Sequence, residues 1–338
     1  MATSQAAEPI LDIAHLGNIE ILSPKPAESL DYFVNILGME NVHTEGNSVY
    51  LRGYGDYATS TVKLTAAKAP GVGCVSWRAS SPQALERRAQ AIQDSGLGIG
   101  WTNGEYGRGP AFRFNDPEGH IMEVYYEETA YEAPDNLKSK LKNLPQRYTG
   151  RGINVRRIDH LALLAKDVAS NREFAQDLLG LKLREQVRFN DGQTEIGSWL
   201  SPNPVHHQMA YVTDVKGGTA RVHHFGLWVD EQQDVLRAAE ILMEAGIFIE
   251  AGPSKHNNSQ GFYLYHYEPG GNRMEVYSGS YLVFAPDFKP VTWNEDERGT
   301  GVYWGAALPD SFLNYATPDV EATPEAAAAP KVPIFDTH

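Results

Sequence analysis

The sequence predicts an α+β protein of two domains, each made of paired βαβββ modules whose strands form a half-open barrel. The main observation is an internal repeat, because three segments of the first half recur in the second half with matching spacing. The repeated segments read as strands, and two of them continue into an amphipathic helix. A chain of 338 residues is also long enough for two domains, each with a buried core.

The first repeated segment covers residues 18–38 and recurs as residues 160–180. Both copies begin with an extended apolar stretch, pass through a loop and continue into a helix that ends at a glycine, Gly38 or Gly180. The apolar residues of each helix share one face: Leu30, Phe33, Val34 and Leu37 in the first copy, and Phe174, Leu178 and Leu179 in the second. Each copy therefore predicts a strand followed by a helix.

The other two repeated segments complete the modules. Residues 74–96 recur as residues 224–246, and each copy is a strand that leads into a helix. Residues 115–125 recur as residues 267–277, and here a Pro/Gly turn leads into a strand. The helix of the second copy has these residues on one face: Val235, Ala238, Ala239 and Leu242.

The repeat also sets the domain boundaries. We expect domains at residues 10–130 and 157–315, separated by a charged, apolar-poor linker at residues 131–156 that is partly helical. The run from Ala316 to Lys331 is rich in Ala, Pro and Glu. A disordered tail is therefore expected over residues 316–338.

Composition excludes several kinds of partner. A net charge of −14 disfavours nucleic acid, which is bound through clustered Lys and Arg. Cys74 is the single cysteine of the sequence, so no disulfide can form within the chain and an intracellular protein is expected. The sequence has no signal-peptide pattern and no run of about 18 apolar residues. We therefore expect a cytoplasmic protein with no membrane partner.

A comparison of the two halves separates a candidate metal site from its scaffold. The second half has two imidazoles and a carboxylate where the first half has an amide, a thiol and a carboxylate: His160, His224 and Glu275 against Asn18, Cys74 and Glu123. Two His and one carboxylate, with open positions, form the metal site of non-haem Fe(II) oxygenases. The first set suits a divalent ion poorly, so the N-terminal half is predicted to be structural and free of metal.

His223 and His224 are adjacent, and neighbouring side chains of a strand face opposite sides. The register of the repeat selects His224 as the inward-facing residue. His223 is then expected to be a support or surface residue.

A longer motif in the second half carries a family resemblance. It consists of His256 through Tyr265, Glu268-Pro269 and Gly271 to Glu275. With the repeat and the three candidate ligands, it resembles the type I extradiol ring-cleavage dioxygenases of the vicinal oxygen chelate superfamily, which has a glyoxalase-like fold. Within that group the chain is most similar to catechol 2,3-dioxygenase and homoprotocatechuate 2,3-dioxygenase, over about residues 12–315.

The resemblance implies a role for several residues. It implies that the three candidate ligands bind Fe(II), with Mn(II) as a possible substitute, and leave positions open for a catechol and O2. His206 resembles the family's active-site acid and base, a role that suits an imidazole, and His207 is expected to face away. His256 and Tyr265 resemble the pair that hydrogen-bonds the substrate oxygens, and Trp199 resembles an aromatic wall of the pocket. Solvated loop histidines and a core Trp remain the alternatives for His206, His207 and Trp199.

The resemblance also bears on the substrate. Residues 280–305 resemble a segment that covers the substrate. Homoprotocatechuate-type enzymes hold a carboxylate with arginines at two positions that correspond here to Ala251 and, less securely, to Gly301. An uncharged catechol, cleaved by O2 to a 2-hydroxymuconic semialdehyde, is therefore expected, although Arg298 is close enough in sequence to change this.

The family further implies a homo-oligomer, commonly a tetramer. Two rival interpretations remain at this point: a glyoxalase-like metal isomerase, and a binding or resistance protein that buries a ligand without metal.

Overall fold

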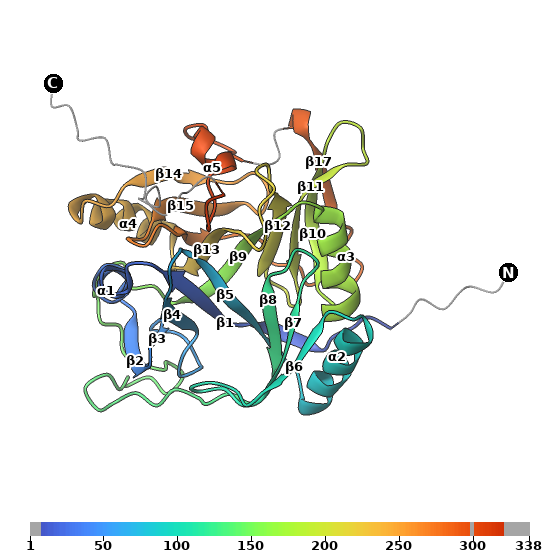
Figure 1. The fold of residues 1–338 in the computed structure, drawn as a ribbon. Coiled ribbons are helices and arrows are strands. Elements are labelled where there is room, and N and C mark those ends of the chain that lie inside the picture. The colour runs from blue at the N-terminus through green and yellow to red at the C-terminus, as the bar shows by residue number, and fades with distance from the viewer. Residues whose placement is uncertain (1–7, 298–300, 321–338) are drawn as a thin grey trace, which may run out of the picture.

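The computed structural model describes residues 8–297 and 301–320 and shows two sheets, one for each half of the chain (Figure 1). The N-terminal sheet has the strand order β2-β3-β4-β1-β5-β8-β7-β6. Its first module contains β1 (Ile13–Ser23), α1 (Pro26–Asp31) with a π-helical turn (Tyr32–Ile36), β2 (Glu40–Glu45), β3 (Ser48–Arg52) and β4 (Val62–Ala66). Its second module contains β5 (Gly71–Ala79), α2 (Pro82–Asp94), β6 (Gly98–Thr102), β7 (Ala111–Asn115) and β8 (Ile121–Tyr125).

The C-terminal sheet repeats this plan and adds one strand, in the order β14-β15-β16-β13-β9-β12-β11-β10-β17. Its first module contains β9 (Arg157–Ala165), α3 (Val168–Leu179), β10 (Lys182–Arg188), β11 (Glu195–Ser201) and β12 (Met209–Thr213). Its second module contains β13 (Val222–Trp228), α4 (Gln232–Glu244), β14 (Ile249–Lys255), β15 (Gly261–Tyr267) and β16 (Arg273–Gly279). The last elements are β17 (Val291–Asn294), a 3-10 turn (Glu295–Glu297) and α5 (Asp310–Asn314). The predicted fold of paired βαβββ modules is confirmed.

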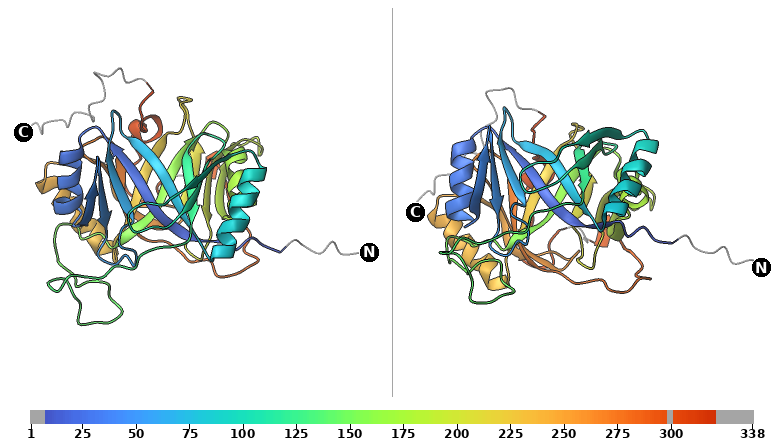
Figure 2. Two further views of the ribbon diagram at one scale, coloured as in Figure 1. Left: turned by 60° about the horizontal axis from the view of Figure 1, so that its bottom comes forward. Right: turned by 90° about the horizontal axis from the view of Figure 1, so that it is seen from below.

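The longer helices each pack against several strands: α2 contacts β5 to β8, α3 contacts β10 to β12, and α4 contacts β14 to β16. In the N-terminal half, α1 and α2 lie at opposite ends of the sheet (Figure 2). Most of the predicted helical faces are buried: Val235, Ala238 and Leu242 of α4 are buried, as are Phe174 and Leu179 of α3, whereas Ala239 and Leu178 are partly buried. Gly180 ends α3 with a positive φ of 72°, as expected for a glycine cap. None of the helices in the described ranges combines the length and the apolar character needed to cross a bilayer.

Two expectations about the connecting segments are wrong. The linker at residues 131–156 contains turns but no helix. It packs on the N-terminal domain through buried Ile153 and Val155, and Gln146 accepts a hydrogen bond from the Arg52 guanidinium. These tertiary contacts satisfy the extended backbone, so a helix is not needed.

The expected disordered tail begins too early. Ala316 and Thr317 are buried, and Thr317 exchanges two backbone hydrogen bonds with Val222 of β13, at 2.8 and 3.0 Å. Residues 316–320 are therefore part of the folded domain. The rest of the predicted tail, residues 321–338, lies outside the described residues.

The two domains are joined by buried hydrogen bonds around Glu268. Its carboxylate accepts a 2.6 Å hydrogen bond from Ser29 Oγ of α1 and further bonds from the backbone N–H groups of Gly270 and Asn272. Asn272 Nδ2 also donates to the Leu22 carbonyl of β1 at 2.9 Å. The turn before β16 is thereby attached to the N-terminal domain.

Glu268→Ala should lower the free energy of unfolding by roughly 3 kcal/mol, because it leaves several buried donors without an acceptor. Urea unfolding followed by circular dichroism measures this. The control is Asp135→Ala, which removes an exposed ion pair with Lys138 and should have little effect. Equal stability of Glu268→Ala and the wild type would contradict the role given to this turn.

Candidate metal centre

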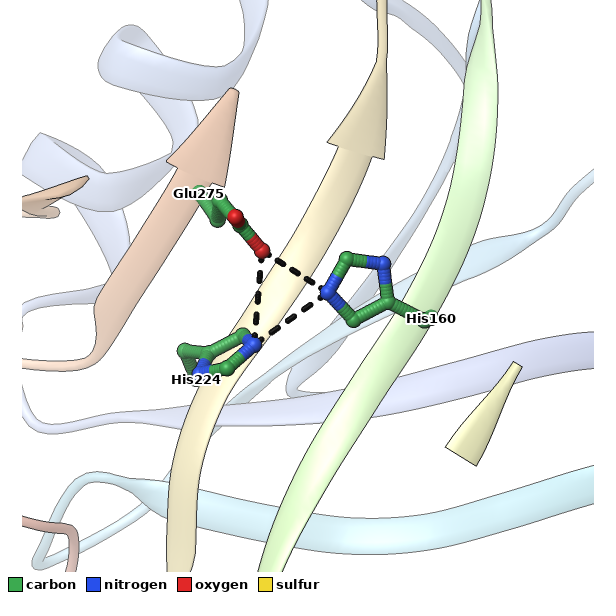
Figure 3. A group of neighbouring side chains, drawn as sticks. All are labelled: His160, His224 and Glu275. Atoms are coloured by element: carbon green, nitrogen blue, oxygen red, sulfur yellow. Dashed lines mark hydrogen bonds and ion pairs between the residues drawn. The ribbon is translucent and has the colours of Figure 1, made fainter. Parts of the chain in front are cut away.

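Three side chains from three neighbouring strands point to a common position in the C-terminal sheet (Figure 3). They are His160 of β9, His224 of β13 and Glu275 of β16, and all are buried. His160 Nε2 lies 2.7 Å from Glu275 Oε2 and 3.2 Å from His224 Nε2. Within the described ranges this is the one group of His, Cys, Asp and Glu residues placed to hold a metal ion.

The strand register explains why these residues meet. β13 lies between β9 and β16, and Gly226 of β13 pairs with both His160 and Glu275. A Cβ atom at Gly226 would lie 2.4 Å from Cε1 of the His160 ring. The imidazole therefore lies directly over the missing side chain. The sequence analysis overlooked Gly226, although the repeat contains a signal, since the matching residue of the N-terminal half is Ser76.

The buried negative charge of Glu275 favours a cation at this site. The Glu275 carboxylate is buried, and neither oxygen has a hydrogen bond of conventional geometry, although His160 Nε2 lies 2.7 Å from Oε2. Burial disfavours the charged imidazole of His160, but attraction to Glu275 and a hydrogen bond to Asp159 outweigh it and raise the pKa of His160 to about 9. Burial also opposes ionisation of Glu275, yet His160 holds the pKa of this carboxyl well below its ordinary value. A proton and a metal ion are thus alternative sources of the same positive charge.

The donor set fits a divalent transition metal. Two imidazole nitrogens and one carboxylate from one side of a cavity suit Fe(II) or Mn(II) and leave positions open. Each imidazole is oriented by a second group: Asp159 Oδ2 lies 2.9 Å from His160 Nδ1, and His223 Nδ1 lies 2.6 Å from His224 Nδ1. Such partners fix which ring nitrogen is free to bind a metal.

His223 is a buried support residue and not a surface residue. Its Nε2 donates to the Phe312 carbonyl of α5 at 2.7 Å, so its Nδ1 can accept a hydrogen from His224. The strand pairing is irregular between Val222 and His224. This irregularity lets both adjacent rings reach the interior, which strict alternation would prevent.

A cavity of about 380 Å³ opens in front of the candidate ligands. Trp199, His256 and Tyr265 line it, as the resemblance implied for a substrate pocket. The wall is mainly apolar, and among the described lining residues there is no Lys or Arg. Its apolar lining includes Leu164, Val187, Phe189, Ile196, Val212, Val215, Phe312 and Leu313.

The described part of the expected covering segment does not line this cavity. Within residues 280–305, no described residue lines the cavity, although the Gly301 carbonyl lies 2.8 Å from His256 Nδ1. Phe312 and Leu313 of α5, just beyond that segment, line the cavity instead. Arg298 lies outside the described residues.

The geometry corrects the choice between His206 and His207. The structure places His207 on the cavity wall, with its ring centroid 4.2 Å from that of His160. His206 turns away and its Nε2 lies 2.9 Å from Glu185 Oε1. The prediction that His206 is the cavity acid and base is therefore wrong on position.

A bend explains the error. Alternate positions counted back from Ala210 of β12, which lines the cavity, would select His206. The chain bends at Gln208, whose side chain accepts a 3.1 Å hydrogen bond from the Leu16 N–H of the N-terminal domain. Residues 202–206 also form bends, so the segment before β12 is not an extended strand and simple alternation does not hold at His206 and His207.

The N-terminal half neutralises its own carboxylate. Glu123 lies 2.7 Å from an Arg108 guanidinium nitrogen and 3.1 Å from one of Arg113, and it accepts from Ser76 Oγ at 2.8 Å. Asn18 and Cys74 are buried at the other two positions. Guanidinium groups thus supply the positive charge in this half.

Comparison with known proteins agrees with this architecture. Residues 157–276 match the glyoxalase/bleomycin resistance protein/dioxygenase superfamily. The chain is 42% identical to a metapyrocatechase of Geobacillus stearothermophilus over 314 residues, which cover 92% of this chain and 95% of the relative. This chain belongs to the extradiol dioxygenases of the vicinal oxygen chelate superfamily. The isomerase and binding-protein interpretations are accordingly set aside.

Other extradiol dioxygenases are similar over most of their length. A protein named manganese-dependent 2,3-dihydroxybiphenyl 1,2-dioxygenase, of Geobacillus genomosp. 3, is 37% identical and covers 87% of this chain and 94% of its own. The solved 2,3-dioxygenase LapB of Pseudomonas sp. KL28 is 25% identical with a TM-score of 0.78, and covers 85% of this chain and 99% of its own. Homoprotocatechuate 2,3-dioxygenase of Brevibacterium fuscum, at 24% identity, shares the fold with a TM-score of 0.81 over 94% of this chain and 96% of its own.

Gly226→Ala should weaken metal binding about 10- to 100-fold while all three ligands remain, because the new methyl group displaces the His160 ring. Anaerobic titration with Mn(II) measures the affinity, and circular dichroism checks the fold. Ser76→Ala, at the matching position of the other half, is the control and should bind the metal normally. An unchanged affinity of Gly226→Ala would show that the ring is not confined as described.

Proposed function

We propose that this dioxygenase catalyses Fe(II)-dependent extradiol cleavage of catechol, or of an uncharged substituted catechol, in the degradation of aromatic compounds. Both atoms of O2 are incorporated into the product as the C–C bond beside the two hydroxyl groups breaks. Catechol then yields 2-hydroxymuconic semialdehyde. The observation that carries the proposal is the buried group of His160, His224 and Glu275 at the end of an apolar cavity.

Fe(II) would be held by these three residues and would supply a site where a catechol and O2 meet. Mn(II) is the alternative, because the same donors accept it and a relative 37% identical to this chain is named manganese-dependent. The residues of the chain prepare the site by holding a negative carboxylate between two oriented imidazoles.

We also propose that His256 and Tyr265 bind the catechol oxygens, and their hydrogen bonds support this role. The Gly301 carbonyl can only accept, so His256 Nδ1 carries a hydrogen toward it, at 2.8 Å. The other nitrogen, Nε2, then accepts from the Tyr265 hydroxyl at 3.1 Å. The Tyr265 oxygen keeps lone pairs that can receive a hydrogen bond from a substrate hydroxyl. We also propose His207, in place of His206, as the acid and base of the cavity.

The cavity favours an uncharged ring. A buried carboxylate needs a cationic partner, and the described cavity wall offers no Lys or Arg. Ala251 packs against the cluster of Tyr263, Tyr265 and Tyr277 and provides no charge. A homoprotocatechuate-type or other substituted catechol remains the alternative substrate.

Further proposals concern the whole protein. We propose a cytoplasmic homo-oligomer, a tetramer by analogy with the family, in which part of residues 280–305 helps to close over the substrate. The single cysteine, Cys74, supports a reducing compartment. Size-exclusion chromatography with light scattering would test the oligomeric state.

Catechol should be turned over at least about tenfold more efficiently than homoprotocatechuate, because the carboxylated ring must bury an unpaired charge. The ratio of kcat/KM for the two substrates, measured with an oxygen electrode, tests this. A preference for the carboxylated ring would refute the proposed substrate class and leave the dioxygenase activity intact.

Reconstitution tests the metal and the reaction together. After anaerobic loading with Fe(II), the wild type should consume O2 when catechol is added and form a yellow product, and His224→Ala should lose nearly all of this activity. His223→Gln serves as the comparison, since it changes the neighbouring imidazole but keeps the ligand. Equal activity in the wild type and His224→Ala would remove His224 from the metal site.

A further inference from the structure

Three buried side chains form a hydrogen-bonded chain that ends at the cavity. Glu185 of β10 accepts from His206, with Oε1 and Nε2 2.9 Å apart. His206 Nδ1 lies 2.8 Å from His207 Nδ1. His207 lines the cavity in front of the candidate ligands, whereas Glu185 lies outside it and is 2% exposed.

The surroundings of Glu185 determine the direction of these hydrogen bonds. The carboxylate also accepts from the Ser259 backbone N–H at 3.0 Å, the Tyr281 hydroxyl at 2.7 Å and the Trp293 indole N–H at 2.6 Å. Amide and indole N–H groups can only donate, so Glu185 must act as the acceptor. Although burial disfavours the ionised carboxyl, the hydrogen bonds from His206, Tyr281 and Trp293 lower the pKa of Glu185 overall.

The acceptor role of Glu185 then fixes which nitrogens of His206 and His207 carry a hydrogen. His206 Nε2 must carry a hydrogen because it faces the carboxylate, and a neutral imidazole carries only one. His206 Nδ1 is therefore an acceptor, and His207 Nδ1 must be the donor to it. This leaves His207 Nε2 without a hydrogen, as the ring nitrogen available to the cavity.

We propose that Glu185 and His206 are positioning residues that hold His207 in a single tautomer, with its Nε2 lone pair free to accept a hydrogen bond from a hydroxyl group of the substrate. The inference rests on the proposed function for the identity of that substrate, but the tautomer itself does not. Orientation of a functional imidazole by a more distant carboxylate is a general device in proteins.

A second cavity, of about 510 Å³, supports this placement. It is lined by both His206 and His207, and by Tyr281. His207 therefore lines both cavities, whereas His206 lines only the second one. The His207 ring contacts His160 and Tyr277, with ring centroids 4.2 and 6.0 Å apart, and the hydrogen bond to His206 fixes which of its nitrogens carries the hydrogen.

Variants of Glu185 and His206 test the inference in the full-length protein loaded with Zn(II), which is diamagnetic. ¹⁵N-histidine NMR reports the tautomer of His207, whose signals are assigned by their loss in His207→Gln. Glu185→Gln and His206→Leu should move these signals toward a mixture of tautomers. His206→Gln keeps one donor and one acceptor in the chain, and should restore the wild-type pattern.

Kinetics with the Fe(II) enzyme provide the second measurement. Glu185→Gln should lower kcat about 10- to 100-fold and change the KM for catechol by less than about threefold, because orientation is lost and the binding surface is kept. Glu195→Gln is the matched control, since Glu195 is a buried carboxylate on the adjacent strand that pairs with Arg172. It should alter neither the NMR pattern nor kcat.

The outcomes separate this inference from the proposed function. Unchanged His207 signals in both Glu185→Gln and His206→Leu would overturn it, and if Glu185→Gln does not fold, His206→Leu alone decides. If the variants shift the His207 signals but the wild type consumes no O2 with catechol, the positioning role is upheld and the proposed reaction is refuted.

Discussion

The structure depends on one electrostatic constraint, the burial of the Glu275 carboxylate at the centre of the C-terminal sheet. A carboxylate that receives no conventional hydrogen bond is costly to bury unless a positive charge lies beside it. The strand order places His160 and His224 within reach, and Gly226 leaves room for the first of these rings. Hydrogen-bond partners behind each imidazole then direct one ring nitrogen toward the shared position.

Each half of the chain buries a carboxylate at the matching position, and the two halves neutralise it with different cations. Glu123 occupies in the N-terminal sheet the place that Glu275 occupies in the C-terminal sheet, and it is paired with Arg108 and Arg113. A guanidinium group fills its site permanently and leaves no coordination position open. One duplicated architecture thus yields a self-neutralised scaffold in one half and, as we propose, a reactive centre in the other.

Much of this could be predicted from sequence because the repeat compares the chain with itself. The βαβββ modules follow from matched periodicities, and the candidate ligands stand out because the other half lacks two of them. What could not be predicted depends on contacts between distant segments. The bends before β12, where Gln208 contacts Leu16 of the other domain, place His207 rather than His206 on the cavity wall. The pairing of Thr317 with Val222 orders a segment whose composition indicated disorder. The irregular linker owes its shape to similar contacts.

The most direct test of the central claim is a crystal structure of the Fe(II)-loaded protein with anomalous diffraction measured at the iron edge. The account predicts a single anomalous peak per chain, about 2.0–2.2 Å from His160 Nε2, His224 Nε2 and a carboxylate oxygen of Glu275. A peak beside Asn18 and Glu123, or an ion bound without Glu275, would contradict it.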